Sequence, residues 1–136
     1  MSIRENENQI FNKYNKAEYP EIVLDGMVCE NEYKDAPVQL EFILKEVNGK
    51  GVGDLRDFLL NGGREQTWSN VARWVVGIFS IENEAEWKSV YNISKAEETE
   101  QRKKILSKII AVNCKKTPGR TTTNKIEVKN FIKRGV

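Results

Sequence analysis

The alternation of apolar and polar residues along the chain predicts two buried strands, each followed by a polar loop and a helix. The first apolar stretch runs from Val38 to Asn48 and leads into a glycine-rich loop at residues 49–53. The second runs from Ile109 to Asn113 and leads into a basic loop at residues 114–120. The dense β-branched and aromatic residues of the first stretch are typical of a largely buried strand.

Helical spacing of apolar residues predicts helices before, between and after these strands. The helices that we expect cover residues 2–17, a short segment capped by Asp54, a stronger segment opened by Thr67, a weaker segment at residues 83–91, a segment that begins with a capping box at Ser94 to Glu97, and a final segment capped by Asn124 and closed by Gly135. Residues 21–36 have a mixed pattern with a turn signal at Asp25-Gly26, which predicts a loop with one short strand near Ile22.

This order of elements indicates an α/β protein. We expect a single domain over residues 1–136, with a small, largely parallel central sheet flanked by helices in α/β/α layers. Two strands make a poor sheet, because a stable sheet generally needs three or more. Three alternatives stay open: the Ile22 region supplies a third strand, a partner copy completes the sheet, or the chain is a partial copy of a longer fold.

The amino-acid composition limits the kinds of site that the chain can form. Of the 136 residues, 39% are hydrophobic and 31% are charged, which is typical of a folded domain in water. There is no histidine, and Cys29 and Cys114 lack the spacing of metal ligands. We therefore expect no metal site, no cofactor and no nucleophile paired with histidine. No apolar run approaches the ~18 residues of a membrane span, so we expect a cytoplasmic protein with reduced thiols and no membrane partner.

Positive charge gathers toward the end of the chain, although the net charge is only +2. A nearly balanced charge neither requires nor excludes a polyanionic partner, so clustering has to decide. The clustered basic residues are Lys115, Lys116 and Arg120 in the second loop, and Lys125, Lys129 and Lys133 at i, i+4 and i+8 on the last predicted helix. This density predicts contacts with phosphates.

Asn48 and Asn113 each end a predicted strand. Open α/β sheets bind ligands just beyond the carboxyl ends of their strands, so we predict the functional site here. The backbone amides of Gly49 and Gly51 are able to cradle an anionic group, but the run lacks the ending of a P-loop. A purely structural turn at Asn48-Gly49 stays open as an alternative.

These two strand–loop segments resemble the uracil-DNA glycosylase superfamily. Residues 42–49, FILKEVNG, resemble its first motif, in which a buried strand ends in a Gly-x-Asn-Pro-Gly loop, with Glu46 and Gly49 in place of the first Gly and the Pro. Residues 110–119, IAVNCKKTPG, resemble its second strand motif, an apolar run that ends in Asn and continues into a basic loop with a proline. The third motif, a late loop with a histidine in many members, has no counterpart.

The resemblance implies an enzyme that recognises a uracil-like base in DNA and excises it by hydrolysis of the N-glycosidic bond, without metal or cofactor. Asn48 would hold the attacking water and Asn113 would read the edge of the base, with Gly49 and Gly51 beside them. Phe58 or Trp68 would supply a stacking face. The residues that would contact the DNA backbone are Lys115, Lys116, Arg120, Lys125 and Lys129.

Two other functions stay open at this point. A non-catalytic relative would bind any DNA in a salt-sensitive manner, without preference for uracil. A structural or interaction protein would complete its sheet with another chain, or with a copy of itself, through an open strand edge, and would have no affinity for DNA.

Overall fold

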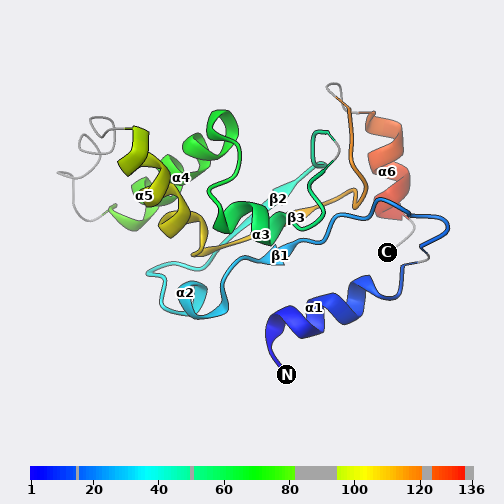
Figure 1. The fold of residues 1–136 in the computed structure, drawn as a ribbon, viewed down its shortest axis with the longest axis horizontal. Helices are drawn as coiled ribbons and strands as arrows, with labels where there is room; N and C mark the ends of the chain where they lie inside the picture. Colours follow the sequence, from blue (N-terminus) through cyan, green and yellow to red (C-terminus); the bar gives the residue numbers. More distant parts are fainter. Residues whose placement is uncertain (15, 50, 82–94, 121–123, 134–136) are drawn as a thin grey trace.

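The computed structural model describes residues 1–14, 16–49, 51–81, 95–120 and 124–133 (Figure 1). In chain order its elements are α1 (Ile3–Phe11), β1 (Gly26–Met27), α2 (Glu30–Lys34), β2 (Leu40–Leu44), α3 (Leu55–Leu60), α4 (Glu65–Phe79), α5 (Lys95–Leu106), β3 (Ile109–Asn113) and α6 (Lys125–Lys133). The predicted α/β class is confirmed. The helix expected at residues 83–91, the capping residue Ser94 and the closing Gly135 lie outside the described residues.

The three strands form one mixed sheet in the order β1-β3-β2. β2 runs parallel to β3, with Leu40 opposite Ile109 and Leu44 opposite Asn113. β1 runs antiparallel to β3 and is therefore the third strand that the sheet needs. It lies at Gly26–Met27, past the predicted Ile22 region, where the sequence indicates a turn. Gly26 has a φ of 131°, a backbone conformation that residues other than glycine rarely adopt. Because Asp-Gly is typical of a turn, the sequence did not indicate that Gly26 belongs to a strand.

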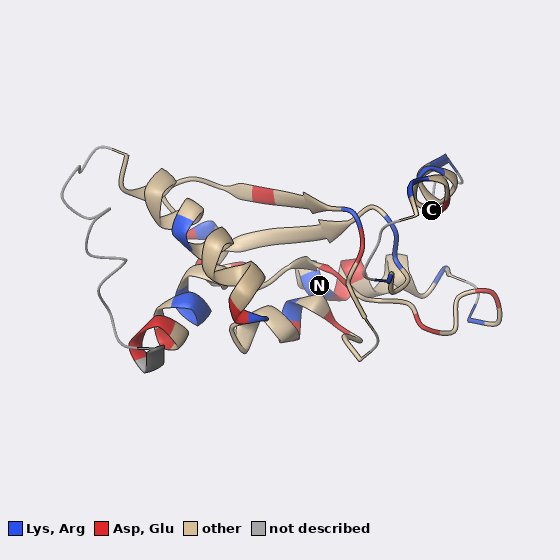
Figure 2. Ribbon diagram, turned by 90° about the horizontal axis from the view of Figure 1, so that it is seen from above, with Lys and Arg blue, Asp and Glu red and all other residues tan. Residues whose placement is uncertain are grey.

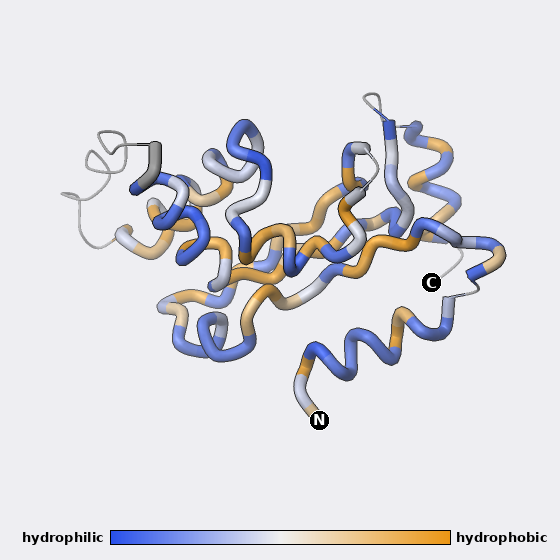
Figure 3. The backbone as a smooth tube through the Cα atoms, viewed as in Figure 1, coloured by the Kyte–Doolittle hydropathy of each residue, from blue (hydrophilic) through white to orange (hydrophobic). Residues whose placement is uncertain are grey.

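The helices α3, α4 and α5 cover one face of the sheet (Figure 2). Leu40, Phe42 and Leu44 point to this side and pack against a core that α3, α4 and α5 share with β3. The alternate residues of β2 point the other way, because side chains along a strand alternate between faces. Of these, Glu41 is exposed and Ile43 is 76% exposed. In Figure 3 the strands are mostly hydrophobic, while α1 is mostly hydrophilic.

A second, smaller core joins the two ends of the described chain. Phe11, Tyr14 and Phe131 are buried together, with the rings of Tyr14 and Phe131 stacked at a centroid distance of 6.4 Å. Burial raises the pKa of Tyr14 above its ordinary value, and the carboxylate of Asp25 adds to that shift. These aromatic contacts hold α6 next to the segment that follows α1. The N-terminus of α6 is capped as predicted, since Asn124 Oδ1 accepts hydrogen bonds from two backbone N–H groups.

A buried arginine ties α1 to the start of α3. Arg56 is only 1% exposed, and its guanidinium donates hydrogen bonds to Glu7 at 2.8 Å, to Asn8 at 2.8 Å and to Asp54 at 2.7 and 2.9 Å. Asp54 also caps α3, as the sequence predicts, by accepting from the backbone N–H of Arg56. Burial alone would raise the pKa of Asp54, but its bonds to Arg56 outweigh burial and lower it.

We expect Arg56→Ala to lower the free energy of unfolding by about 3 kcal/mol, because it removes a buried guanidinium and leaves the half-buried carboxylates of Glu7 and Asp54 without this partner. Arg4→Ala, which removes an exposed partner of Asp54 and Asp57, is the matched control and should cost less than ~1 kcal/mol. Urea unfolding at neutral pH measures both values. Equal effects of the two variants would contradict the role of Arg56.

The same contact predicts a pH dependence. The folded-state pKa of Asp54 is lowered, so its stabilising contribution is present above the unfolded-state pKa and is lost as pH falls through the folded-state value. Urea unfolding repeated from neutral to acidic pH should therefore show a shallower loss of stability in Arg56→Ala than in the parent chain. Parallel pH profiles would contradict this assignment.

Candidate functional site

The loops that follow β2 and β3 lie side by side and pair with each other. The backbone N–H of Gly119 donates to the carbonyl of Val47 at 2.8 Å, and the N–H of Gly49 donates to the carbonyl of Gly119 at 3.3 Å. The register of the parallel strands leads to this contact, because it sets Leu44 opposite Asn113 at the same edge of the sheet. The structure therefore brings together the two loops that the sequence singles out.

The segment before β1 holds these loops from a third side. The N–H of Val23 donates to the carbonyl of Lys116 at 2.7 Å, and the N–H of Leu24 donates to the carbonyl of Gly53 at 2.9 Å. Leu24 also accepts from the N–H of Leu55 at 2.8 Å, so this one short segment touches the ends of both loops. The sequence predicts only a loop with a short strand here.

A cleft of about 370 Å³ opens at this end of the sheet. It is lined by Leu44, Lys45, Glu46, Val47, Asn48, Val52, Leu55, Phe58, Arg64, Thr67, Trp68 and Asn113. Both predicted asparagines and both predicted aromatic residues thus face one space. Its volume is within the usual range of pockets that bind small molecules.

Asn113 lines the cleft and has a buried side-chain oxygen without a hydrogen-bond partner among the described residues. Asn113 is only 2% exposed. Its Nδ2 donates to Asp25 Oδ2 at 3.2 Å, and its backbone N–H donates to the same oxygen at 2.6 Å. A carboxylate paired with a lysine can only accept hydrogen bonds, so the amide nitrogen has to face Asp25. Asn113 Oδ1 is left buried and has no hydrogen-bond partner among the described residues.

Glu46, which lines the same cleft, has the second buried oxygen of this kind. Its side chain is 5% exposed, and its Oε2 accepts from the ammonium of Lys115 at 3.0 Å. Its Oε1 is buried and unpartnered in the part of the chain that the structure describes. The sequence signal was a single carboxylate at the end of an otherwise apolar strand. In the comparison with the glycosylase motif, Glu46 stands only as a departure from the first Gly.

Lys115 links this carboxylate to α6. Its ammonium also donates to Glu127 Oε2 at 3.1 Å, so it lies between two carboxylates. Burial works to lower the pKa of Lys115, but the bonds to Glu46 and Glu127 outweigh burial and raise it above its ordinary value. Lys115 therefore stays protonated over the whole neutral range.

The other predicted site residues differ in their surroundings. Asn48 is exposed at the rim of the cleft, and Gly49 and Gly51 have φ values of 88° and 100°, which glycine adopts readily. The ammonium of Lys116 points inward and lies 2.9 Å from both oxygens of Asp25. Of the clustered basic residues, those that are exposed are Arg120, Lys125, Lys129 and Lys133.

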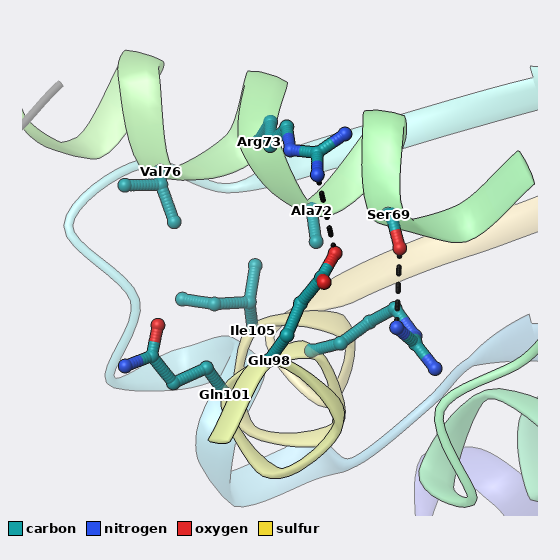
Figure 4. A pocket seen from close by; sticks show the side chains of 8 residues that line it. Ser69, Ala72, Arg73, Val76, Glu98, Gln101 and Ile105 are labelled. Atoms are coloured by element: carbon teal, nitrogen blue, oxygen red, sulfur yellow. Dashed lines mark hydrogen bonds and ion pairs between the residues drawn. The ribbon is translucent and has the colours of Figure 1, made fainter. Parts of the chain in front are cut away.

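Two other cavities lack such groups. A space of about 30 Å³ between α4 and α5 is bordered by Arg73 and Glu98, which pair at 3.2 Å, and by Arg102, which donates to Ser69 at 3.1 Å (Figure 4). A cleft of about 450 Å³ lies between α1 and the segment before β1. Glu46 Oε1 and Asn113 Oδ1 are the buried, unpartnered side-chain oxygens of the described residues, and neither oxygen lines these two cavities.

The described residues set two further bounds on the chemistry. None of their helices is long and apolar enough to cross a membrane. Nor do they contain a group of three or more Cys, Asp or Glu side chains that could hold a metal ion.

Gly119 controls the position of the Glu46 carboxylate. A Cβ at residue 119 would collide with that carboxylate, which is the movable end of a flexible side chain, so Gly119→Ala should displace Glu46 without unfolding the protein. Because Lys115 then loses one of the two partners that raise its pKa, we expect this pKa to fall. NMR titration of the lysine side chains measures it. Gly53→Ala, whose Cβ meets no atom within 4 Å, is the control, and an unchanged Lys115 pKa in Gly119→Ala would contradict the contact.

Comparison with protein-family models, with curated proteins and with solved structures gives no match for this chain.

Proposed function

We propose that this protein recognises a uracil-like base of DNA in the cleft between the two loops and hydrolyses its N-glycosidic bond. The observation that carries the proposal is that two residues lining one cleft with aromatic walls, Glu46 and Asn113, each keep a buried oxygen without a partner among the described residues. A buried acceptor without a partner costs free energy, so a native structure keeps it for a ligand, a water molecule or a reaction.

Asn113 has the hydrogen-bonding pattern that an imide requires. Its free Oδ1 accepts from the imide N–H of the base, and Nδ2 keeps a second hydrogen for a neighbouring carbonyl, since Asp25 takes only one. Phe58 and Trp68 line the same cleft and offer ring surface to the base. A base that is flipped out of the stack would be read by such a combination of edge contacts and stacking.

Glu46 is the general base in this proposal. Its free Oε1 accepts a proton from a water molecule as the water oxygen forms a bond to the sugar C1′. The C1′–N bond breaks at the same time, and its electron pair leaves with the base. Lys115 pairs with the other oxygen, Oε2, and so holds the carboxylate in place, which leaves Oε1 for the proton. Asn48, at the rim of the cleft, orients the water, in agreement with the role that the family resemblance implies.

The basic face of α6 supplies the contact with the DNA backbone. The ammonium groups of Lys125, Lys129 and Lys133 have no partner among the described residues, and they border a groove of about 380 Å³ between α6 and the end of β2. Figure 2 shows the blue segments of α6 beside the C-terminal label, past the ends of the strands. Exposed lysines of this kind gain binding energy by releasing counterions from DNA. Arg64, exposed at the mouth of the cleft, adds a further positive charge.

Excision is tested by incision of end-labelled oligonucleotides that contain uracil, in single- and double-stranded form, after alkali treatment. Glu46→Gln keeps the shape of the side chain but removes its basicity, so we expect the rate to fall by roughly 10²- to 10⁴-fold. Asn113→Ala and Asn48→Ala should also lose activity.

The matched control is Glu32→Gln, which changes an exposed carboxylate on α2 in the same way. It also exposes contamination by a host glycosylase, because such an enzyme would cut equally in every preparation. Full activity of Glu46→Gln would contradict its role as base. Binding without cleavage by the folded parent chain would favour the non-catalytic DNA-binding relative.

DNA binding is tested by the salt dependence of affinity. Lys125→Ala combined with Lys129→Ala should weaken binding and lower the slope of log K against log salt by about 1.4 to 1.8, since each phosphate contact contributes about 0.7 to 0.9. The control pair is Lys34→Ala with Lys108→Ala, two lysines that are paired with glutamates on α2. Equal slopes for the two double variants would show that these lysines of α6 do not contact the DNA backbone.

A further inference from the structure

β2 forms an open edge of the sheet. Among the described residues it pairs with β3 alone, so the backbone groups along its other side have no strand partner. Proteins usually protect such an edge, often with charged residues that prevent pairing with a second chain. Here the two charged residues near the edge, Glu41 and Lys45, have opposite signs, so they do not simply repel a second copy of the strand.

The charges are placed symmetrically about Ile43. Glu41 lies two residues before it on the same uncovered face, and Lys45 lies two residues after it, exposed in the bend that follows β2. In the protomer, neither Glu41 nor Lys45 has an ion-pair partner among the described residues. If a second β2 pairs antiparallel about Ile43, each Glu41 lies opposite Lys45 of the other copy. Ile43 then lies opposite itself, and Phe42 lies opposite Leu44.

α4, which packs on the same core as β2, offers a second surface. Ser69, Ala72, Arg73 and Val76 border the space next to α5, whereas Trp68, Val71 and Val75 are buried in the core. At 100° per residue, Trp74 and Ile78 lie on the remaining side of the helix, which faces away from α5. Trp74 is 57% exposed and Ile78 is also exposed, one helical turn apart. An exposed tryptophan and isoleucine on one side indicate an interaction surface.

We propose that two copies of this chain associate by antiparallel pairing of their β2 strands about Ile43, which joins their sheets into one and brings Trp74 and Ile78 of the two α4 helices together. The occupant is a second copy because the edge is complementary to itself, as a twofold interface requires. Two Glu41–Lys45 pairs and an Ile43–Ile43 pair form on the open face. This association does not depend on the proposed enzymatic function.

Sedimentation equilibrium of the full chain over a range of protein concentrations tests the register by charge exchange. Glu41→Lys alone places two like-charged pairs across the interface and should raise the dimer dissociation constant by roughly tenfold or more. Lys45→Glu alone should do the same. The double variant, Glu41→Lys with Lys45→Glu, restores opposite charges at both positions and should return the dissociation constant close to the parent value.

Two further variants separate this interface from other contacts. Ile43→Lys and Trp74→Ala should each weaken the dimer, whereas Ile126→Lys, at an exposed isoleucine of α6, should leave it unchanged. Circular dichroism confirms that each variant is folded. A parent chain that stays monomeric at all concentrations would overturn the proposal, and so would a dimer that the single charge reversals do not weaken or that the double exchange does not restore.

Discussion

The site depends on one buried carboxylate, that of Asp25. It receives the backbone and side-chain N–H groups of Asn113 and the ammonium of Lys116, and it precedes the strand that completes the sheet. A buried charge is tolerated only when it is paired and hydrogen-bonded, so Asp25, Asn113 and Lys116 hold one another in position. Because Asp25 can only accept, it also decides which end of the Asn113 amide faces the cleft. The hydrogen bonds of Asp25 thus stabilise the fold and also set the orientation of the Asn113 amide.

The sequence predicted the elements whose signals are local. β3 has the predicted bounds, Ile109 to Asn113, because a dense apolar run between polar residues is read without reference to other strands. The caps of α3 and α6 were predicted correctly for the same reason, since Asp54 and Asn124 act within their own turns. β1 could not be placed, because two residues become a strand only through pairing with β3. α4 begins at Glu65, before the predicted Thr67, and its capping residue Arg64 makes no capping hydrogen bond with its side chain.

The candidate site shows the same division. The ends of parallel strands meet, so the sequence was enough to predict that Asn48 and Asn113 lie at one cleft. It was not enough to show which way Lys115 and Lys116 point, because their partners Glu46 and Asp25 lie 69 and 91 residues away. The surroundings of Glu46 could not be predicted, because an ion pair at one oxygen and an unpartnered second oxygen are properties of the folded chain alone.

The shared ammonium of Lys115 has a consequence for sequence variation. Lys115, Glu46 and Glu127 together carry one positive and two negative charges, and both carboxylates raise the pKa of Lys115. Glu127 lies on the exposed surface of α6, where substitutions are usually neutral for stability. A change from Glu to Gln at this surface position would nevertheless leave Glu46 as the only carboxylate paired with Lys115 among the described residues, and would remove one of the two causes of the raised Lys115 pKa. An exposed residue of α6 thus influences the charged groups beside a cleft that it does not line.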